Sequence, residues 1–301
     1  MSEASIDKLE GIELKQRLKK KGRAKEIWRR FKKSKTAMAG LFIFIFIMLI
    51  VIFADAIVPY AVSVTQKISN RFIAPGSPGH PFGTDNFGRD ILARIVHGSR
   101  NSLLVGIGAV TFGIAIGGLL GAVAGFYGGT VDSLIVRTLD MIMCIPLMLL
   151  VLSIVAAIGA SLVNVLIAMM IANVPHYTRI VRAAVLSVVG QDYIEAARAC
   201  GTPDFWIIIK HVIPNAIGPI IVQATMAVGT MIINAAGISF LGMGIQPPTP
   251  EWGAMLNEAK NYMLNYPYTV FFPGMAIGLT ALSLNLMGDG LRDALDPKLK
   301  D

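Results

Sequence analysis

Few residues of this chain could do chemistry, and they are scattered. His176 follows a proline inside an apolar stretch and could act as a base, while Asp289 lies between two glycines near the end of the last apolar stretch. Nucleophilic catalysis needs a nucleophile beside a base, and a zinc site needs several closely spaced ligands. The chain has no His-Glu-x-x-His motif, and Asp289 sits at a span end without an intramembrane aspartate partner. A lone histidine near a helix end is more often a satisfied polar residue, so we expect no enzymatic activity.

Sites that would supply energy for transport are also missing from the sequence. No Gly-x-x-x-x-Gly-Lys-Ser/Thr loop is present to cradle the phosphates of ATP. Residues 103–127, 141–177 and 213–250 contain no Asp, Glu, Lys or Arg, whereas gradient-driven carriers place ionisable groups in mid-membrane. We therefore expect this chain to bind no cofactor and to receive energy from a partner.

The composition indicates an integral membrane protein with a basic N-terminal tail. Of 301 residues, 54% are hydrophobic and 15% charged, against about a quarter charged in soluble domains. Residues 1–37 hold thirteen Lys and Arg against five Asp and Glu. Because Ile27, Trp28 and Phe31 share one helical face, an amphipathic helix on an anionic cytoplasmic leaflet fits better than nucleic-acid binding or a disordered topology signal. The two cysteines, Cys144 and Cys200, predict no disulfide or metal framework.

Long uncharged runs predict six membrane-spanning helices, since about 20 residues cross the hydrocarbon core. The predicted spans are residues 37–58, 102–125, 140–160, 162–180, 216–243 and 270–288. The fourth is the weakest because Asn164, Asn173, Pro175 and His176 interrupt it. With both termini cytoplasmic, 21 Lys and Arg lie inside and six outside.

This topology divides the chain into a core and its flanking segments. It predicts a basic cytoplasmic tail (1–36), the first span, an external segment with an interfacial helix (59–101), a five-helix core (102–289) and a cytoplasmic C-terminus (290–301). Within the core, residues 181–215 form a cytoplasmic loop and residues 245–268 an external one. Gly113, Gly117, Gly121 and Gly125 recur every four residues along the second span, which predicts a helix-packing seam.

The segment DYIEAARACGTPDFWIIIKHVIPNA, residues 192–216, is a polar interruption in the apolar pattern. Asp192 to Cys200 predicts a short helix, which Gly201 would end in a left-handed cap. Thr202 would cap a second helix that begins near Pro203 and is broken by Pro214. A rigid hairpin of this kind is suited to docking: Ala196 and Ala197 would leave a low-profile face, and Glu195 would hold the turn through hydrogen bonds.

The spacing within this segment resembles the EAA loop of binding-protein-dependent ABC importer permeases. Gly201 follows the glutamate of Glu195-Ala196-Ala197 by six residues, and Ile213-Pro214 follows it by eighteen and nineteen. His211 stands at the usual isoleucine position and Ile213 at the usual leucine, and KHVIPN is similar to the His-bearing version of the dipeptide, oligopeptide and nickel branch. Three further stretches resemble the C-type permease of that branch: HPFGTDNFGRDILARIVHGSRNSL from His80, ISFLGMGIQPPTPEWGAML from Ile238 and LNLMGDGLRDALDPKL from Leu284.

The resemblance covers about residues 35–299 and implies an all-α, polytopic fold of the type I ABC importer permease in the cell membrane. It implies a non-catalytic subunit that forms half of a translocation pathway for dipeptides or oligopeptides. The implied partners are a homologous second permease, two ATPase subunits that hold ATP and Mg, and an extracytoplasmic substrate-binding protein. The implied coupling residues are Glu195, Ala196, Ala197, Gly201, Thr202, Pro203, His211 and Pro214.

Two alternatives remain at this point. Nickel or another small solute is the alternative cargo, because a largely neutral pathway offers few directional groups to identify its substrate. A passive channel is the alternative mechanism, but it leaves the polar segment without a role.

The external motifs also have plain structural interpretations. Thr84 or Asp85 can cap an interfacial helix whose apolar stripe includes Ile91 and Ile95. Arg89 and Arg94 would then be solvated, and Trp252 would be an interfacial aromatic in a rigid, proline-rich loop. At the other end, Asp289, Arg292 and Asp293 would finish the last helix at the cytoplasmic surface.

Overall fold

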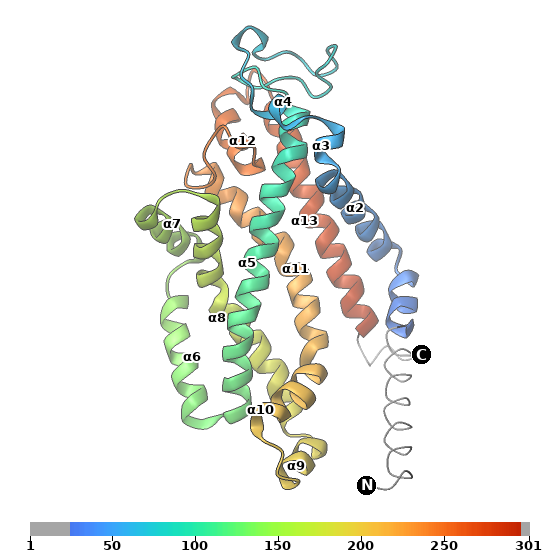
Figure 1. The fold of residues 1–301 in the computed structure, drawn as a ribbon, viewed down its shortest axis with the longest axis vertical. Coiled ribbons are helices and arrows are strands. Elements are labelled where there is room, and N and C mark those ends of the chain that lie inside the picture. The colour runs from blue at the N-terminus through green and yellow to red at the C-terminus, as the bar shows by residue number, and fades with distance from the viewer. Residues whose placement is uncertain (1–24, 296–301) are drawn as a thin grey trace.

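The computed structural model describes residues 25–295, and within that range the chain is almost entirely helical and contains no β-sheet. The long helices run roughly along the long axis of the molecule, with α9 at one end and the loops around α4 and α12 at the other (Figure 1). The N-terminal tail lies outside the described residues as far as residue 24, as do residues 296–301 of the C-terminus.

In chain order, a helical stretch at residues 25–33 is followed by α2 (Lys35–Ile52), α3 (Ala54–Ile57), α4 (Tyr60–Val64), the 3-10 turn η1 (Ile68–Asn70), α5 (Ile91–Tyr127), α6 (Gly129–Met143), α7 (Leu147–Ile158), α8 (Leu162–Val189), α9 (Asp192–Ala199), α10 (Asp204–Ile207), the π-helical turn η2 (Ile208–Val212), α11 (Ile213–Phe240), α12 (Trp252–Ala259), the 3-10 turn η3 (Lys260–Tyr262) and α13 (Tyr268–Leu295).

Helices α5 and α8 pack closely along the glycine seam. Gly113, Gly117, Gly121 and Gly125 all face α8 and are all buried. A Cβ added at Gly117 would lie 2.7 Å from the carbonyl oxygen of Val174, and one at Gly121 would lie 2.5 Å from that of Thr178. Glycine is needed at these positions because the backbones of α5 and α8 lie so close together that a side-chain methyl group would not fit between them.

The helix pair α6 and α7 is bent by 81° at residues 144–146. The sequence predicted one span at residues 140–160, and the structure breaks the helix inside that range. Pro146 is the N-cap of α7, and the ring of a proline disfavours helical geometry in the residue before it. The chain therefore leaves α6 before the proline and restarts in a new direction.

Four helical segments are long and apolar enough to cross a membrane: α2, α5, the continuous segment Asp204–Phe240, and α13. The bent pair α6 and α7 raises the number to five in the described part of the chain. Helix α8 has 28 residues, a length of about 42 Å at 1.5 Å per residue, but its polar residues keep its hydropathy low. The six-span count therefore stays a prediction.

Two span boundaries differ from the sequence prediction. Helix α5 begins at Ile91, where the side chain of Asp90 accepts a hydrogen bond from the Ala93 N–H, and it runs on as the second span. The expected separate interfacial helix is thus the first part of α5, and neither Thr84 nor Asp85 caps it. The first span ends earlier than predicted, at Ile52, and the short α3 follows it.

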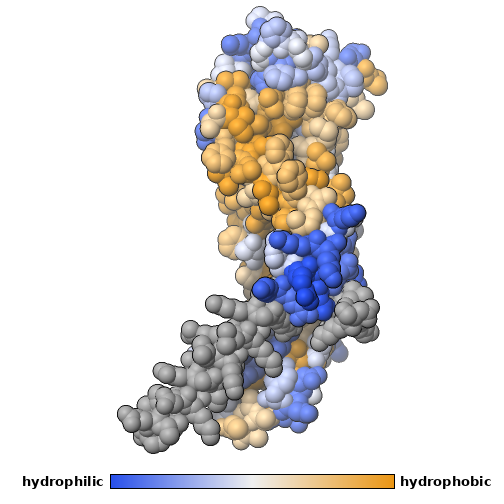
Figure 2. Space-filling view, turned by 90° about the vertical axis from the view of Figure 1, so that its right-hand side faces the viewer, coloured by the Kyte–Doolittle hydropathy of each residue, from blue (hydrophilic) through white to orange (hydrophobic). Residues whose placement is uncertain are grey.

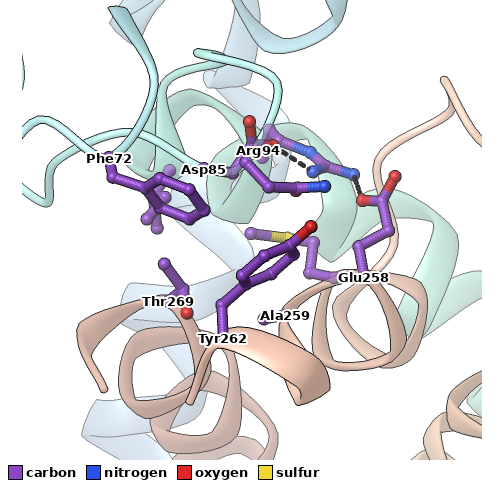
Figure 3. A pocket seen from close by; sticks show the side chains of 10 residues that line it. Phe72, Asp85, Arg94, Glu258, Ala259, Tyr262 and Thr269 are labelled. Carbon is purple, nitrogen blue, oxygen red and sulfur yellow. Dashed lines mark hydrogen bonds and ion pairs between the residues drawn. The ribbon is translucent and has the colours of Figure 1, made fainter. Parts of the chain in front are cut away.

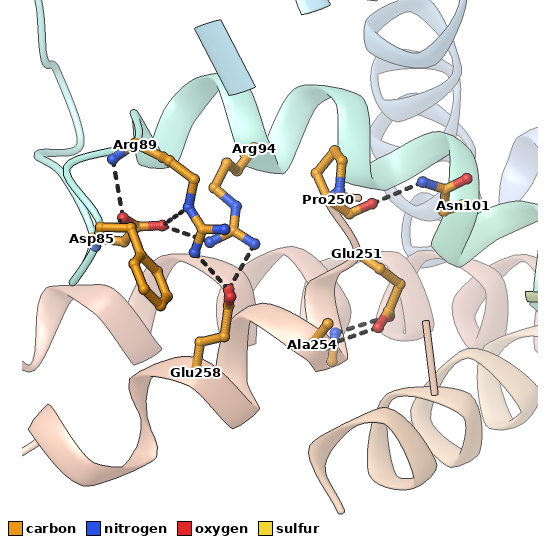
Figure 4. Close-up of polar contacts among 10 residues, drawn as sticks. Asp85, Arg89, Arg94, Asn101, Pro250, Glu251, Ala254 and Glu258 are labelled. Atoms are coloured by element: carbon orange, nitrogen blue, oxygen red, sulfur yellow. Dashed lines mark hydrogen bonds and ion pairs between the residues drawn. The ribbon is translucent and has the colours of Figure 1, made fainter. Parts of the chain in front are cut away.

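Residues 59–90, called the outer segment after their predicted external location, are fixed by a buried ion cluster of Asp85, Arg89, Arg94 and Glu258 (Figure 4). Asp85 Oδ2 lies 2.7 Å from Arg89 Nε and 2.5 Å from Arg94 Nη1. Glu258 Oε2, on α12, lies 2.8 Å from Arg89 Nη2 and 2.7 Å from Arg94 Nη2. The arginine side chains are 0% and 1% exposed, so the expectation that they are solvated is wrong.

Aromatic side chains lie against one side of the ion cluster (Figure 3). Phe72 from the outer segment and Tyr262 from η3 line the same small pocket as Arg94 and Glu258. Phe72 also stacks on Tyr266, with ring centroids 3.9 Å apart. Because low dielectric strengthens the attraction between opposite charges, this cover reinforces the join between the outer segment, α5 and α12.

Glu251 and Trp252 complete the join between α12 and α5. Glu251 accepts hydrogen bonds from the Gly253 and Ala254 N–H groups and from Ser102 of α5. Burial raises the pKa of Glu251 above its ordinary value, and these hydrogen bonds oppose the shift. Trp252 is 2% exposed and donates from Nε1 to the Ile95 carbonyl. It is a core residue, contrary to the predicted interfacial aromatic.

The surface carries the polarity pattern of a membrane protein. On the face shown in Figure 2, apolar side chains form a belt between a polar end, at the top of the view, and a strongly polar patch just below the middle of the molecule. The exposed side chains of α2 include Phe42, Phe46 and Leu49. A belt of this kind is expected where helices face lipid.

Candidate functional site

The polar segment forms a hairpin at one end of the bundle, in which α9 and α10 meet at a glycine cap (Figure 1). Gly201 has φ +72°. Its N–H donates to the Arg198 carbonyl, and the Thr202 N–H donates to the Ala197 carbonyl. These two bonds form a Schellman motif, which satisfies the last carbonyls of α9 and turns the chain sharply. This hairpin, residues 191–214, is thus a defined element of structure, and it is called the coupling hairpin after its predicted role.

Three apolar side chains anchor the coupling hairpin to the helices above it. Ile194 of α9, Ile207 of α10 and Val212 of η2 are each 0% exposed and belong to one buried cluster. The same cluster includes Phe126 at the end of α5 and Val185 of α8. A movement of the hairpin would therefore be transmitted to the ends of α5 and α8.

The outward face of the coupling hairpin presents several of the residues predicted to act in coupling. Glu195, Ala196, Gly201, Pro203 and Pro214 are all exposed. Exposed large apolar side chains lie in the same hairpin, with Phe205 64% and Trp206 46% exposed. Exposed apolar side chains that lie together mark a contact site for another protein or for a membrane surface.

Some details of the predicted hairpin differ in the structure. Ala197 is half-buried against the apolar cluster, so it does not share the outward face of Ala196. The N-cap of α10 is Pro203 rather than Thr202, and no side chain caps that helix. The side chain of Glu195 forms no hydrogen bond with the residues described here, so the predicted bond holding the turn is absent.

The second helix of the hairpin does not end before Pro214 as predicted. It continues through η2 into α11, and Pro214 occupies the first turn of α11. Proline is tolerated in the first turn of a helix, where its missing N–H is not needed, and the π-helical turn η2 comes directly before α11. His211 lies in η2 and is half-buried. The hairpin is consequently joined to the fifth predicted span without a flexible link.

Two ion pairs support the same end of the bundle. Nε of Arg182 in α8 lies 2.5 Å from Oδ1 of Asp132 in α6. Nη2 of Arg179 in α8 lies 2.5 Å from Oδ1 of Asp140, also in α6. The second pair is largely exposed, and exposed pairs contribute at most about 1 kcal/mol. Their role is to fix the relative position of α6 and α8 beside the coupling hairpin.

A cavity of about 770 Å³ lies between the α6–α7 bend, α8, α11 and α13. Its neutral polar lining residues are Asn173, Gln223, Thr230, Asn234 and Asn285. The two titratable residues singled out in the sequence, His176 and Asp289, also line it, so the structure brings them to one cavity. Tyr177 is buried there, and its hydroxyl has no hydrogen-bond partner among the described residues.

Matches to known families cover most of the chain. Residues 117–301 match the family described as binding-protein-dependent transport system inner membrane component. The chain belongs to this family of transport permeases. Residues 22–75 of the permease also match the N-terminal transmembrane domain of oligopeptide transport permease C.

Several relatives resemble the permease over nearly its whole length. It is 48% identical to the dipeptide transport system permease protein DppC of Alkalihalophilus pseudofirmus, over 92% of this chain and 90% of the relative. It is 46% identical to the glutathione transport system permease protein GsiD of Escherichia coli O157:H7, over 91% and 90%. It is 41% identical to the di/tripeptide transport system permease protein DppC of Pseudomonas aeruginosa, over 92% and 93%.

A solved structure confirms the type of fold. The permease is similar to a chain of the MetNI methionine ABC transporter in an inward-facing conformation, with a TM-score of 0.56 and 18% identity. The match covers 68% of the permease and 98% of that chain. The predicted ABC importer permease fold and family are therefore confirmed, while the roles of individual coupling residues stay predictions.

The sequence did not reveal how the functional regions of the permease are supported. The cavity lining could have been suspected from the spacing of Asn, Gln and Thr on apolar helices, since polar groups in membrane helices usually face the bundle interior. Glu258, the second carboxylate of the ion cluster, carried no local signal. It lies 169 residues from the Arg89 to which it is bonded.

Proposed function

We propose that the permease is a non-catalytic subunit of an ATP-driven importer and forms half of its peptide pathway. The observation that carries this proposal is the anchored coupling hairpin, whose exposed face is suited to an ATPase groove and whose buried face is fixed to α5 and α8. The remaining subunits would be a homologous second permease, two ATPases holding ATP and Mg, and an extracytoplasmic binding protein.

Coupling follows from the stiffness of this connection. When ATP binding closes the ATPase pair, the groove around Glu195 to Pro203 would move and carry the hairpin with it. Because Ile194 and Ile207 are packed against the ends of α5 and α8, the movement would tilt these helices and switch the cavity from inward to outward facing. A two-state element of this kind needs different contacts in each state, which the ATPase pair would supply.

Peptides are the proposed cargo because relatives at 41–48% identity are named for dipeptide, di/tripeptide and glutathione transport. The cavity fits that chemistry, since side-chain amides such as Asn234 and Asn285 can both donate to and accept from peptide groups. Nickel or another small solute, the alternative from the sequence, gains no support from these names.

The energy source gives the direct test of this function. Purified alone, the permease is expected to show no ATPase activity, because the sequence contains no phosphate loop. Reconstituted with its partners, it should take up labelled dipeptide as long as ATP is present, even after an ionophore has collapsed the proton gradient. Uptake that follows the gradient and ignores ATP would indicate a carrier instead.

The proposed orientation places both termini and the coupling hairpin in the cytoplasm and residues 60–100 and 245–268 outside. Single cysteines at Ser69, Gln191 and Asn257 would be introduced into a chain lacking Cys144 and Cys200, which are both exposed. An impermeant thiol reagent on intact cells should label the sites at Ser69 and Asn257 and spare the site at Gln191. Labelling at Gln191, or at neither outer site while permeabilised cells label all three, would reverse the topology.

A further inference from the structure

The helical stretch at residues 25–33 is fixed to the membrane helices by a small apolar contact. Phe31 is 7% exposed and clusters with Ala37 of α2 and Ala294 of α13. A Cβ added at Gly290 would lie 2.1 Å from Ala37 Cβ and 3.3 Å from Phe31 Cε2. The stretch therefore has a defined position against α2 and α13, beyond the general surface binding that its amphipathic sequence predicted.

An apolar groove of about 380 Å³ opens beside this contact. Ile27 and Trp28 of the stretch form one wall, and Leu41, Met287 and Leu291 of α2 and α13 form the other. Thr225 of α11 closes it, but its hydroxyl already donates to the Ile221 carbonyl. The volume is in the range of ligand sites, about 300–1,000 Å³, and the lining suits a hydrocarbon chain.

Exposed basic side chains lie next to the groove residues in the chain. Lys32, Lys33 and Lys35 are exposed, and Lys32 Nζ lies 5.1 Å from the centroid of the Trp28 ring, which lines the groove. Glu26 is the one acidic residue between positions 25 and 37, and it pairs with Arg30. On this face a strongly polar patch lies directly below the apolar belt, at the level where lipid headgroups would meet the protein (Figure 2).

We propose that this groove is a specific site for an anionic phospholipid. One acyl chain lies against Trp28, Met287 and Leu291, and the phosphate is held by Lys32 with Lys33 and Lys35. An acyl chain is stabilised by each methylene that leaves water, and each nearby cation strengthens the binding of an anionic headgroup about fivefold. The lipid would join the basic stretch to α2 and α13 whatever the cargo is, so this site does not depend on the proposed function.

Charge complementarity favours a phospholipid as the occupant of the groove over a helix of the second permease and over the adjoining part of the N-terminal tail. A helix of the second permease would have to bring acidic side chains to meet the lysines. Residues 15–24 of the same chain hold six Lys and Arg and no Asp or Glu, so this adjoining part of the tail would be repelled by these lysines. Residues 1–14 hold four acidic residues against one lysine, and deletion of the tail tests whether they cover the groove, because labelling by phosphatidylglycerol should then not rise. A phospholipid supplies both an apolar tail for the groove and a negative charge for the lysines.

Photolabelling of the assembled transporter would test the site. The permease, its sister permease and the ATPases would be purified into nanodiscs of phosphatidylglycerol and phosphatidylcholine in equal parts, with a diazirine on the acyl chain of one lipid at a time. Phosphatidylglycerol should label peptides containing Trp28, Leu41 or Met287 at least about tenfold more than phosphatidylcholine does.

Matched variants distinguish the contribution of the apolar groove to lipid labelling from that of the lysines. Leu291→Trp, and independently Met287→Trp, should fill the groove and abolish labelling by both lipids. The triple change Lys32→Ala, Lys33→Ala and Lys35→Ala should lower labelling by phosphatidylglycerol about fivefold per lysine and leave phosphatidylcholine unchanged. The control, Lys67→Ala with Arg71→Ala, removes two exposed cations from the outer segment and should change neither.

Three results would overturn the proposal. Equal labelling by both lipids would mean that the groove has only general contact with the bilayer. Labels on the sister permease that disappear with Leu291→Trp would mean that a protein helix occupies the groove. Labelling that is lost when residues 1–24 are deleted, but not when the groove is filled, would place the lipid on the tail.

Discussion

Glu258→Ala is expected to destabilise the outer end of the permease by about 3–5 kcal/mol, the usual cost of removing one partner from a buried ion pair. In the intact cluster two arginines face two carboxylates, and all four side chains are at most 10% exposed. Without Glu258, Arg89 and Arg94 would share Asp85 alone, which leaves one buried positive charge uncompensated. The outer segment would then separate from α12 to let water reach the arginines.

This outcome can be measured as thermal unfolding in nanodiscs together with the rate of proteolysis within residues 60–90. The control is Asp55→Ala, which removes a carboxylate from the pair with Arg100, whose side chains are 64% and 39% exposed. Exposed pairs contribute about 0–1 kcal/mol, so this variant should behave like the unchanged chain. Equal effects of the two substitutions would mean that the cluster is hydrated and does not hold the outer segment.

A charge-balanced variant distinguishes charge from packing in the same cluster. Arg94→Met combined with Glu258→Leu leaves Asp85 paired with Arg89 and no uncompensated charge. It is expected to recover much of the stability lost in Glu258→Ala, since apolar replacements of a buried ion pair are often neutral. If the double variant is no better than the single one, the loss comes from packing.

The features that could be predicted from the sequence are those that depend on residues close together in the chain. The glycines of α5 recur every four residues, a spacing that places them on one helical face, and the structure puts all four against α8. Gly201 was predicted to take a left-handed cap and has φ +72°. Both depend on glycine, whose conformational and steric freedom is visible in a single sequence.

The helix ends were harder to predict because several signals competed. Thr84, Asp85 and Asp90 can each cap a helix, and only the last one does so, because Asp85 is drawn into the ion cluster. Pro146 lies inside the predicted third span, where the chain leaves α6 and starts α7 in a new direction. Pro214 was predicted to break a helix that continues through the π-helical turn η2 into α11, where Pro214 occupies the first turn.

Arg89, Arg94 and Trp252 were misassigned to the surface for a different reason. Charged residues are rarely buried unless they are paired, and the partner of both arginines on α12 is supplied by tertiary folding. Trp252 is buried because α12 returns to α5, where Ile95 accepts its indole N–H. Contacts between segments this far apart leave no pattern in the local sequence.

Gly201→Val is expected to uncouple ATP hydrolysis from transport while leaving the permease folded and inserted. A β-branched residue at a positive φ costs on the order of 1–2 kcal/mol. No atom lies within 4 Å of the position a Cβ would take, so the cost within this chain is backbone strain and not a steric clash. Relieving that strain would undo the Schellman cap and change the angle between α9 and α10, while the buried anchors Ile194 and Ile207 still hold the hairpin to the bundle.

The measurements are co-purification of the ATPases, stimulation of ATP turnover by the binding protein with its substrate, and peptide uptake, with membrane abundance as the reference. Glu195→Ala should act in the same direction but more mildly, because its exposed carboxylate can contact only another subunit. Gly190→Val is the matched control, since Gly190 has a negative φ and open space around it, and it should transport normally.

Gly201→Asn separates backbone strain from contact with the ATPase, because asparagine tolerates the left-handed conformation better than other residues with a side chain. If strain is the cause, the asparagine variant should keep most of the uptake that the valine variant loses. If both lose it, the ATPase groove requires the absence of any side chain at this position. Normal uptake by Gly201→Val at normal abundance would instead show that the cap does not transmit the ATPase movement, and the coupling role of the hairpin would have to be abandoned.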